Sequence, residues 1–105
     1  MTLLHDPRFS SWARGHLLCR VDGITDHFAL TFDDGPNGRG TGELLDLLRV
    51  LDAHATFFML AGNVRRWPDL VRRMVHEGHE PAAHGLLHWP LAVLPPWAIR
   101  NELRQ

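Results

Sequence analysis

The stretch TFDDGP, residues 31–36, places two acidic side chains at the end of an apolar run and follows them with glycine and proline. The residues before the acids, HFALTF at 27–32, are apolar or favour β structure, so they predict a short buried strand that ends in a loop. Asp33 and Asp34 therefore stand at the carboxyl end of a predicted strand. In parallel α/β proteins the working residues gather at that end, because the loops there converge on one face of the sheet.

A helix and a second strand are predicted after this loop. Leucines recur at helical spacing over residues 41–53, and Thr41 is placed to cap the amino end of that helix. The apolar run ATFFML, residues 55–60, is long enough for a strand and too short for a helix. The order of these patterns is that of a βαβ unit.

The second half of the chain repeats the alternation. Apolar residues with arginines between them predict a helix within residues 63–80, where Pro68 suits a first turn. A third short strand is predicted over 79–83, with Pro81 restricting it to a sheet edge or an irregular position. A terminal helix is expected from about Pro96 onward. Successive βα units imply a parallel sheet with right-handed crossovers, hence an α/β fold.

Length and composition limit the classes of protein that fit. The chain has 105 residues, 45% of them hydrophobic and 22% charged, which suits one ordinary folded domain. A formal net charge of -1 and scattered arginines argue against a nucleic-acid partner. Cys19 is the single cysteine, so no internal disulfide is expected. No signal-peptide pattern and no apolar run of about 18 residues occur, so the sequence as written fits a cytoplasmic protein without a membrane span, while the place where the protein works is left open.

Histidines suggest a metal site near the two acids. His84 and His88 follow the third predicted strand, and their HxxxH spacing would put both imidazoles on one side of a helical turn. Two imidazoles and one carboxylate make three protein ligands, the pattern of a catalytic metal site with a water in the fourth position. The second carboxylate is then free to act as a base. Chance spacing in a histidine-rich chain is the alternative. His79 is expected to be a hydrogen-bonded residue at a strand start, and surface or packing roles are expected for the other five histidines: His5, His16, His27, His54 and His76.

The motifs resemble a known family. TFDDGP at 31–36, ATFF at 55–58 and GHEPAAHGLLH at 78–88 are similar, in order and spacing, to motifs of the NodB-homology polysaccharide deacetylases, also called carbohydrate esterase family 4. The resemblance covers residues 25–105 and leaves 1–24 as a lead-in segment. It implies a fold like the first half of a distorted (β/α) barrel.

The resemblance also implies a chemistry. Asp33 would be the general base, and Asp34, His84 and His88 would hold a divalent metal, most often zinc or cobalt. The expected reaction is hydrolysis of N-acetyl groups on an amino-sugar polymer. Three tryptophans could line a cleft for such a sugar, with packing as the alternative for each: Trp67, Trp89 and Trp97.

The sequence departs from the family pattern in three places. Gly85 stands where the family usually has serine or threonine, and Pro81 and Ala82 replace its more usual residues in the preceding strand. The family's later motifs, which include a histidine general acid, would lie beyond residue 105. Three strands cannot close a barrel, so we expect a truncated domain whose open sheet edge is covered by self-association or by a complementing chain.

Two other functions fit parts of the pattern. A non-catalytic remnant that binds metal or glycan would use the same motifs without turnover. Phosphoryl transfer on an aspartyl nucleophile with magnesium would also suit acids at a strand end, but it gives the histidines no role.

Overall fold

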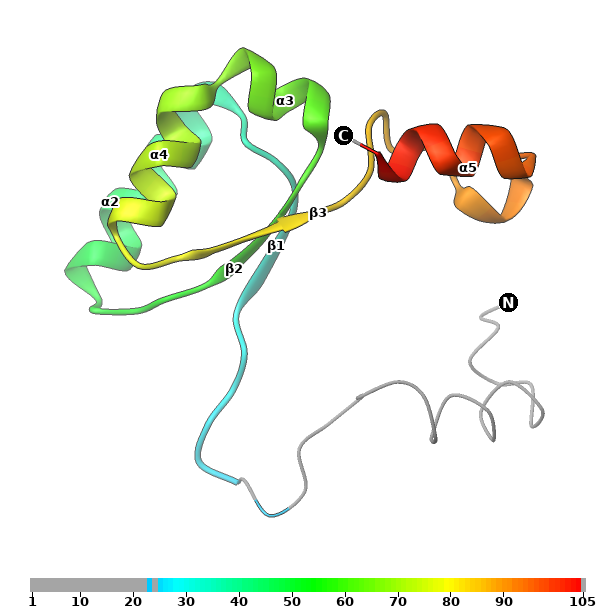
Figure 1. Ribbon diagram of the computed structural model, residues 1–105. Coiled ribbons are helices and arrows are strands. Elements are labelled where there is room, and N and C mark those ends of the chain that lie inside the picture. Colours follow the sequence, from blue (N-terminus) through cyan, green and yellow to red (C-terminus); the bar gives the residue numbers. More distant parts are fainter. Residues whose placement is uncertain (1–22, 24, 105) are drawn as a thin grey trace.

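Three parallel strands form the sheet, in the order β1-β2-β3, with helices packed on one of its faces (Figure 1). The computed structural model describes residue 23 and residues 25–104. The predicted lead-in segment and Cys19 lie outside these residues, except for Gly23. In chain order the elements are β1 (Thr31–Gly35), α2 (Gly38–Val50), β2 (Thr56–Met59), α3 (Ala61–Arg66), α4 (Pro68–His76), β3 (Glu80–Ala83), the 3-10 turn η2 (Leu91–Val93) and α5 (Pro96–Leu103).

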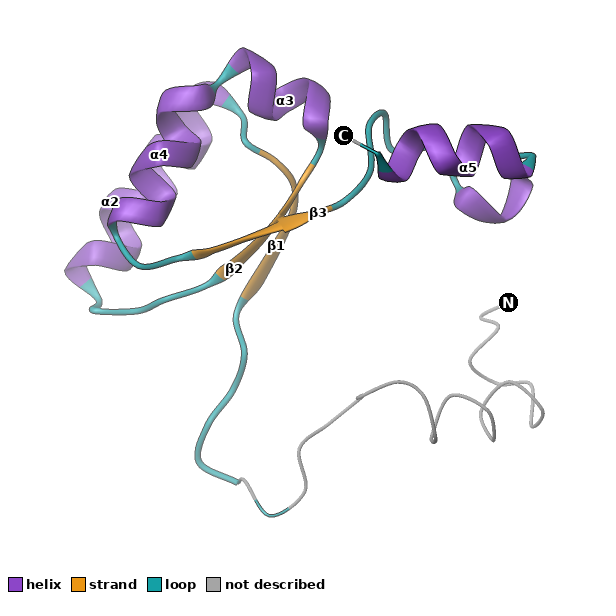
Figure 2. Cartoon of the chain, in the orientation of Figure 1, coloured by secondary structure: helices purple, strands orange, loops and turns teal. Residues whose placement is uncertain are grey.

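The core lies between the middle strand and two helices. α2 and α4 lie side by side over the sheet, whereas α5 lies beyond the end of β3, away from them (Figure 2). Six buried hydrophobic residues form the central cluster: Leu45, Leu48, Ala55, Phe57, Met59 and Met74. The burial of apolar side chains like these is the dominant favourable term in folding. The predicted α/β class with a parallel sheet is confirmed.

The first strand is displaced from its predicted position. It begins at Thr31, paired with Thr56, and continues through both acids to Gly35. The prediction of a strand from His27 was wrong for residues 27–30. The reason is that the neighbouring strand β2 begins only at Thr56, so the residues before Thr31 have no strand residues opposite them.

The cap of α2 is also displaced. Asn37, not Thr41, is the N-cap: its side-chain oxygen accepts a hydrogen bond from the backbone N–H of Thr41 at 3.1 Å. The hydroxyl oxygen of Thr41 in turn accepts from the N–H of Asn37 at 2.8 Å, and the Thr41 side chain is buried in the first turn. The N–H of Asn37 is satisfied by this reciprocal pair, whereas the N–H of Thr41 also donates to the backbone oxygen of Asn37 at 3.0 Å, the first hydrogen bond of the helix.

The helix predicted within residues 63–80 is two helices. Trp67 separates α3 from α4 and has a non-helical backbone, with φ -129° and ψ 53°. Pro68 causes the break, because proline has no N–H to donate and its ring disfavours helical geometry in the residue before it. The third strand and the terminal helix are confirmed, and β3 pairs only with β2 in the described part of the chain, as Pro81 predicted for an edge strand. None of the described helices is long and apolar enough to span a bilayer.

Candidate metal centre

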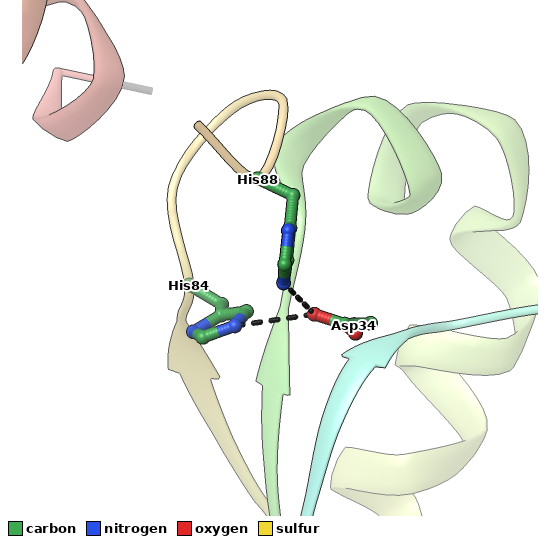
Figure 3. Close-up of side chains that lie close together, drawn as sticks. All are labelled: Asp34, His84 and His88. Atoms are coloured by element: carbon green, nitrogen blue, oxygen red, sulfur yellow. Dashed lines mark ion pairs between the residues drawn. The ribbon is translucent and has the colours of Figure 1, made fainter. Parts of the chain in front are cut away.

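Asp34, His84 and His88 converge at the carboxyl ends of the strands (Figure 3). The Oδ1 atom of Asp34 lies 3.1 Å from Nε2 of His84 and 3.0 Å from Nε2 of His88. The two imidazole rings meet edge to face, with centroids 5.4 Å apart. Asp34 comes from β1 and His84 from the end of β3, so the three side chains meet across the end of the middle strand, β2.

An irregularity in β1 presents Asp34 to the histidines. The pairing with β2 shifts between Asp33 and Gly35, and Asp34 lies between them with φ 70°, in the left-handed region that few non-glycine residues adopt. The side-chain amide of Asn63, in α3, donates a 2.8 Å hydrogen bond to the backbone oxygen of Asp34. The adjacent carboxylates therefore do not follow the simple alternation of a regular strand.

The two histidines lie on a loop and not on a helical turn, so that part of the sequence prediction was wrong. Residues 84–88 have no helical hydrogen bonding; Gly85 has φ 92° and His88 has φ 61°. The N–H of His84 donates to the Met59 oxygen, and the oxygen of Gly85 accepts from the N–H of Ala61, both near 3 Å. The positive φ angles of Gly85 and His88 thus fold the loop so that the imidazole of His88 lies beside that of His84.

The three side chains fit a divalent cation. One ligand atom from each lies within 4.8 Å of the others. Two ligands bound to one zinc ion at about 2.0–2.2 Å can be at most about 4 Å apart, and the oxygen–nitrogen separations of 3.1 Å and 3.0 Å lie within that limit. Two imidazoles and a carboxylate are also ordinary zinc ligands. His84 is partly buried, and Asp34 and His88 are exposed, which leaves the cluster open to solvent.

A cavity of about 780 Å³ adjoins the histidines. His84, His88 and Trp89 are among its lining residues, together with side chains of β3 and α5. Of the three tryptophans proposed to line a sugar cleft, Trp89 is the one that lines this cavity. Trp67 instead packs over Gly38 at the start of α2, and Trp97 is exposed on α5 and does not line the cavity.

The proposed base, Asp33, and the described histidines not proposed as ligands lie partly on the surface and partly in the core. Asp33 is exposed next to Asp34. His27, His54 and His76 are exposed, as expected, while His5 and His16 lie outside the described residues. His79 is buried, and its Nδ1 accepts a 3.3 Å hydrogen bond from the N–H of Ala55, but its Nε2 has no hydrogen-bond partner.

Sequence reasoning missed two residues that support the site. Asn63 contacts the backbone of Asp34, and Glu102, in α5, accepts hydrogen bonds from the backbone of the loop that carries the histidines. Asn63 follows a predicted strand and could have been flagged as a polar residue at the same end of the sheet. Glu102 carried no such signal, since it is one of two charged residues in a short terminal helix.

Comparison with known proteins agrees with this architecture. The sequence model of the polysaccharide deacetylase family matches residues 21–105, so the chain belongs to the polysaccharide deacetylase family. A chitooligosaccharide deacetylase of Rhizobium leguminosarum bv. trifolii is 47% identical over 76 residues, which is 72% of this chain and 35% of that protein. A peptidoglycan-N-acetylglucosamine deacetylase of Bacillus cereus is 52% identical over 59 residues, or 56% of this chain and 21% of the relative.

Solved structures extend the likeness to the fold. The peptidoglycan deacetylase PdaC of Bacillus subtilis matches with a TM-score of 0.69 and 40% identity, over 70% of this chain and 37% of that one. The chitin deacetylase of Colletotrichum lindemuthianum matches with a TM-score of 0.69 and 38% identity, over 73% of this chain and 36% of its own. The chain thus spans about a third of the length of three of these relatives and 21% of the Bacillus cereus protein.

Proposed function

We propose that the chain is a metal-dependent hydrolase that removes N-acetyl groups from an amino-sugar polymer. The observation that carries the proposal is one carboxylate, that of Asp34, within 3.1 Å of the imidazoles of His84 and His88. This cluster lies at the carboxyl ends of a parallel sheet in a member of the polysaccharide deacetylase family. The names of its relatives, which include chitooligosaccharide and peptidoglycan deacetylases, indicate the class of substrate.

Asp34, His84 and His88 are assigned as ligands of zinc or cobalt. When bound, such an ion supplies a Lewis acid for an amide carbonyl and lowers the pKa of water. Asp33 is assigned as the general base, because it is an exposed carboxylate directly next to Asp34 in the sequence. Its side chain would accept the proton that water loses as it attacks the amide carbonyl, a role that contributes about 10²–10⁴-fold to a rate.

The phosphoryl-transfer alternative finds no support in the site. It assigns no role to the histidines, whereas both contact the carboxylate of Asp34. We further propose that residues 25–105 form the deacetylase-like unit and that a second copy or a complementing chain covers the outer edge of β3. That edge adjoins the cavity beside the histidines, which Pro81, Ala82 and Ala83 help to line.

Metal binding is the first test. The purified chain is titrated calorimetrically with zinc and with cobalt, beside a triple variant, Asp34→Ala, His84→Ala and His88→Ala. The matched control replaces one exposed acid and two exposed histidines elsewhere, Asp69→Ala, His27→Ala and His76→Ala. We expect one-to-one binding that the site variant loses and the control keeps. Binding that is absent, or that survives in the site variant, contradicts the proposal.

Acetate release from oligomers of N-acetylglucosamine is the second test. Asp33→Asn is expected to keep metal binding and to lower the rate by about 100-fold or more. Asp69→Asn, an exposed carboxylate on α4, serves as the control and is expected to keep the full rate. Metal binding without any acetate release from the unmodified chain would instead support the non-catalytic alternative.

A further inference from the structure

We propose that Glu102 is a positioning residue for the metal centre, and that its carboxylate fixes the loop between the two histidine ligands. The inference rests on the proposed function of Asp34, His84 and His88. Glu102 lies in α5, and among the described residues no hydrogen bond or ion pair joins it to either histidine. Its role would be exerted through the backbone of residues 84–88.

The contact is a pair of hydrogen bonds to consecutive amides. The Oε2 atom of Glu102 accepts from the N–H of Leu86 at 2.7 Å and from the N–H of Leu87 at 3.1 Å. Both amides lie between the histidines in sequence. Hydrogen bonds to an ionised acceptor are roughly twice as strong as those between neutral groups. One carboxylate therefore satisfies two amides of a loop that has no helical hydrogen bonds of its own.

The burial of Glu102 is unusual for its residue type. Its relative exposure is 7%, and no other acidic residue in the described part of the chain is buried. It is also the only buried residue of α5, in which Ala98 and Ile99 are half-buried and Trp97 and Leu103 are exposed. Burying a charge is costly unless the charge is paired or hydrogen-bonded. The two hydrogen bonds accepted by this carboxylate thus join the helix to the histidine loop.

The loop needs such a restraint. Gly85 and His88 both have positive φ, at 92° and 61°, and a non-glycine residue in that region is held there only by its surroundings. Backbone contacts fix the start of the loop, through His84 and Gly85. Glu102 fixes the following two residues, which lead directly into His88. Without it, the conformation that returns the second imidazole to Asp34 would lose its support.

Gly85 makes room for the carboxylate. A Cβ atom at this position would lie 3.1 Å from Oε2 of Glu102, closer than nearly all such contacts. The glycine therefore permits both the positive φ and the close approach of the acid. The absence of a side chain at Gly85 thus allows the loop backbone to pass close to the buried carboxylate of Glu102.

The test compares three variants of the whole chain: Glu102→Ala, Glu102→Gln and Glu80→Ala. Glu80 is an exposed acid on β3 and provides the matched control. Zinc affinity is measured by calorimetry, and the d–d absorption of bound cobalt reports the geometry of the ligands. Removal of groups that orient metal ligands typically weakens metal binding by about 10–100-fold. We expect a loss of that size and a changed cobalt spectrum in Glu102→Ala, a smaller loss in Glu102→Gln, which retains one oxygen acceptor, and no change in Glu80→Ala.

A second measurement needs no metal. Hydrogen exchange of the Leu86 and Leu87 amides in the metal-free chain should be slow in the unmodified protein and in Glu80→Ala, and fast in Glu102→Ala. Equal exchange rates in all three proteins would overturn the proposal. It would also be overturned if Glu102→Ala kept the zinc affinity and cobalt spectrum of the unmodified chain while Asp34→Ala abolished metal binding. Failure of the unmodified chain to bind metal is a different result: it contradicts the proposed function, and with it the inference. Glu102→Gln keeps the test valid if Glu102→Ala does not fold.

Discussion

The side-chain amide of Asn63 donates a hydrogen bond to the backbone oxygen of Asp34, 2.8 Å away and 29 residues earlier in the chain. This contact ties the first turns of α3 to the irregularity in β1, where Asp34 adopts φ 70°. A residue in that conformation is maintained by its neighbours and not by its own preference. Asn63 is therefore expected to stabilise the orientation of the proposed ligand.

Replacing Asn63 should lower the affinity for metal and should reduce the free energy of unfolding only modestly. Asn63→Ala removes one hydrogen bond at a partly buried position, which typically costs about 0.5–1.5 kcal/mol of unfolding free energy. Urea unfolding measures that loss, and zinc titration should show reduced affinity in the same protein. Arg39→Ala, which removes an exposed ion pair with Glu43 on α2, is the control and should change neither quantity. Unchanged zinc affinity in Asn63→Ala would show that Asp34 keeps its orientation unaided.

Gly85→Ala should be destabilising. The new Cβ would require an alanine at φ 92° and would lie 3.1 Å from the carboxylate of Glu102. Strained backbone positions of this kind cost about 1–3 kcal/mol. Gly42→Ala is the matched control, because Gly42 lies within α2 with nothing near its Cβ position, and alanine there should stabilise the helix by about 0.5–1 kcal/mol. Opposite signs in urea unfolding are expected; a neutral Gly85→Ala would contradict the described loop.

Leu45 should be among the most sensitive core positions. Its side chain is fully buried between α2 and the sheet, so Leu45→Ala removes apolar contacts and leaves a cavity. The expected loss of unfolding free energy is about 2–5 kcal/mol. Leu47, on the same helix, is 53% exposed, and Leu47→Ala should have a much smaller effect. Similar losses for the two variants would mean that the helix packs through a different face.

The stability of the fold should depend on pH through His79. Burial lowers the pKa of this histidine below its ordinary value of 6.5, and the nearby charge of Glu77 opposes the shift only in part, while His54 and Arg73 lower the pKa further. The folded state therefore binds the proton less readily than the unfolded state does. Its contribution to stability is complete above the unfolded pKa of about 6.5 and is lost as the pH falls from there through the lower folded pKa.

Paired urea titrations at about pH 7.5 and about pH 5.5 check the sign of this dependence. His79→Gln removes the titrating group, so its unfolding free energy should fall less on acidification than that of the unmodified, metal-free chain. His76→Gln replaces an exposed histidine and should behave as the unmodified chain does. An equal fall in all three proteins would assign the acid sensitivity to other groups.

Much of the fold could be read from residue patterns. The short apolar run that became β2 and the leucine spacing of α2 are patterns carried by the local sequence. The exact ends of the elements depend on contacts with other residues. β1 starts at Thr31, where Thr56 is available to pair with it. Either Asn37 or Thr41 could have been the N-cap of α2 by residue type, and the structure uses Asn37. The break before Pro68 follows from proline chemistry, although apolar residues on both sides of it suggested one helix.

The candidate site was predictable in its residues and not in its geometry. Asp34, His84 and His88 stand in recognisable motifs, and the parallel sheet brings them to one end. The HxxxH spacing suggested a helical turn, whereas the loop owes its shape to a glycine and to a carboxylate 15 and 16 residues beyond the amides it binds. Contacts between segments so far apart leave no periodic trace in a single sequence.

The proline in β3 affects what can join the sheet. The N–H groups of Glu80 and His84 donate to β2, and donors alternate between the two edges of a parallel strand, so the outer edge falls to residues 81 and 83. Pro81 has no N–H, which leaves Ala83 as the one backbone donor facing outward from Glu80–Ala83. A strand that adds there would meet an incomplete ladder of hydrogen bonds, so its choice of partner and register would depend on side chains that fit the adjoining cavity. Indiscriminate edge-to-edge aggregation is discouraged at the same position.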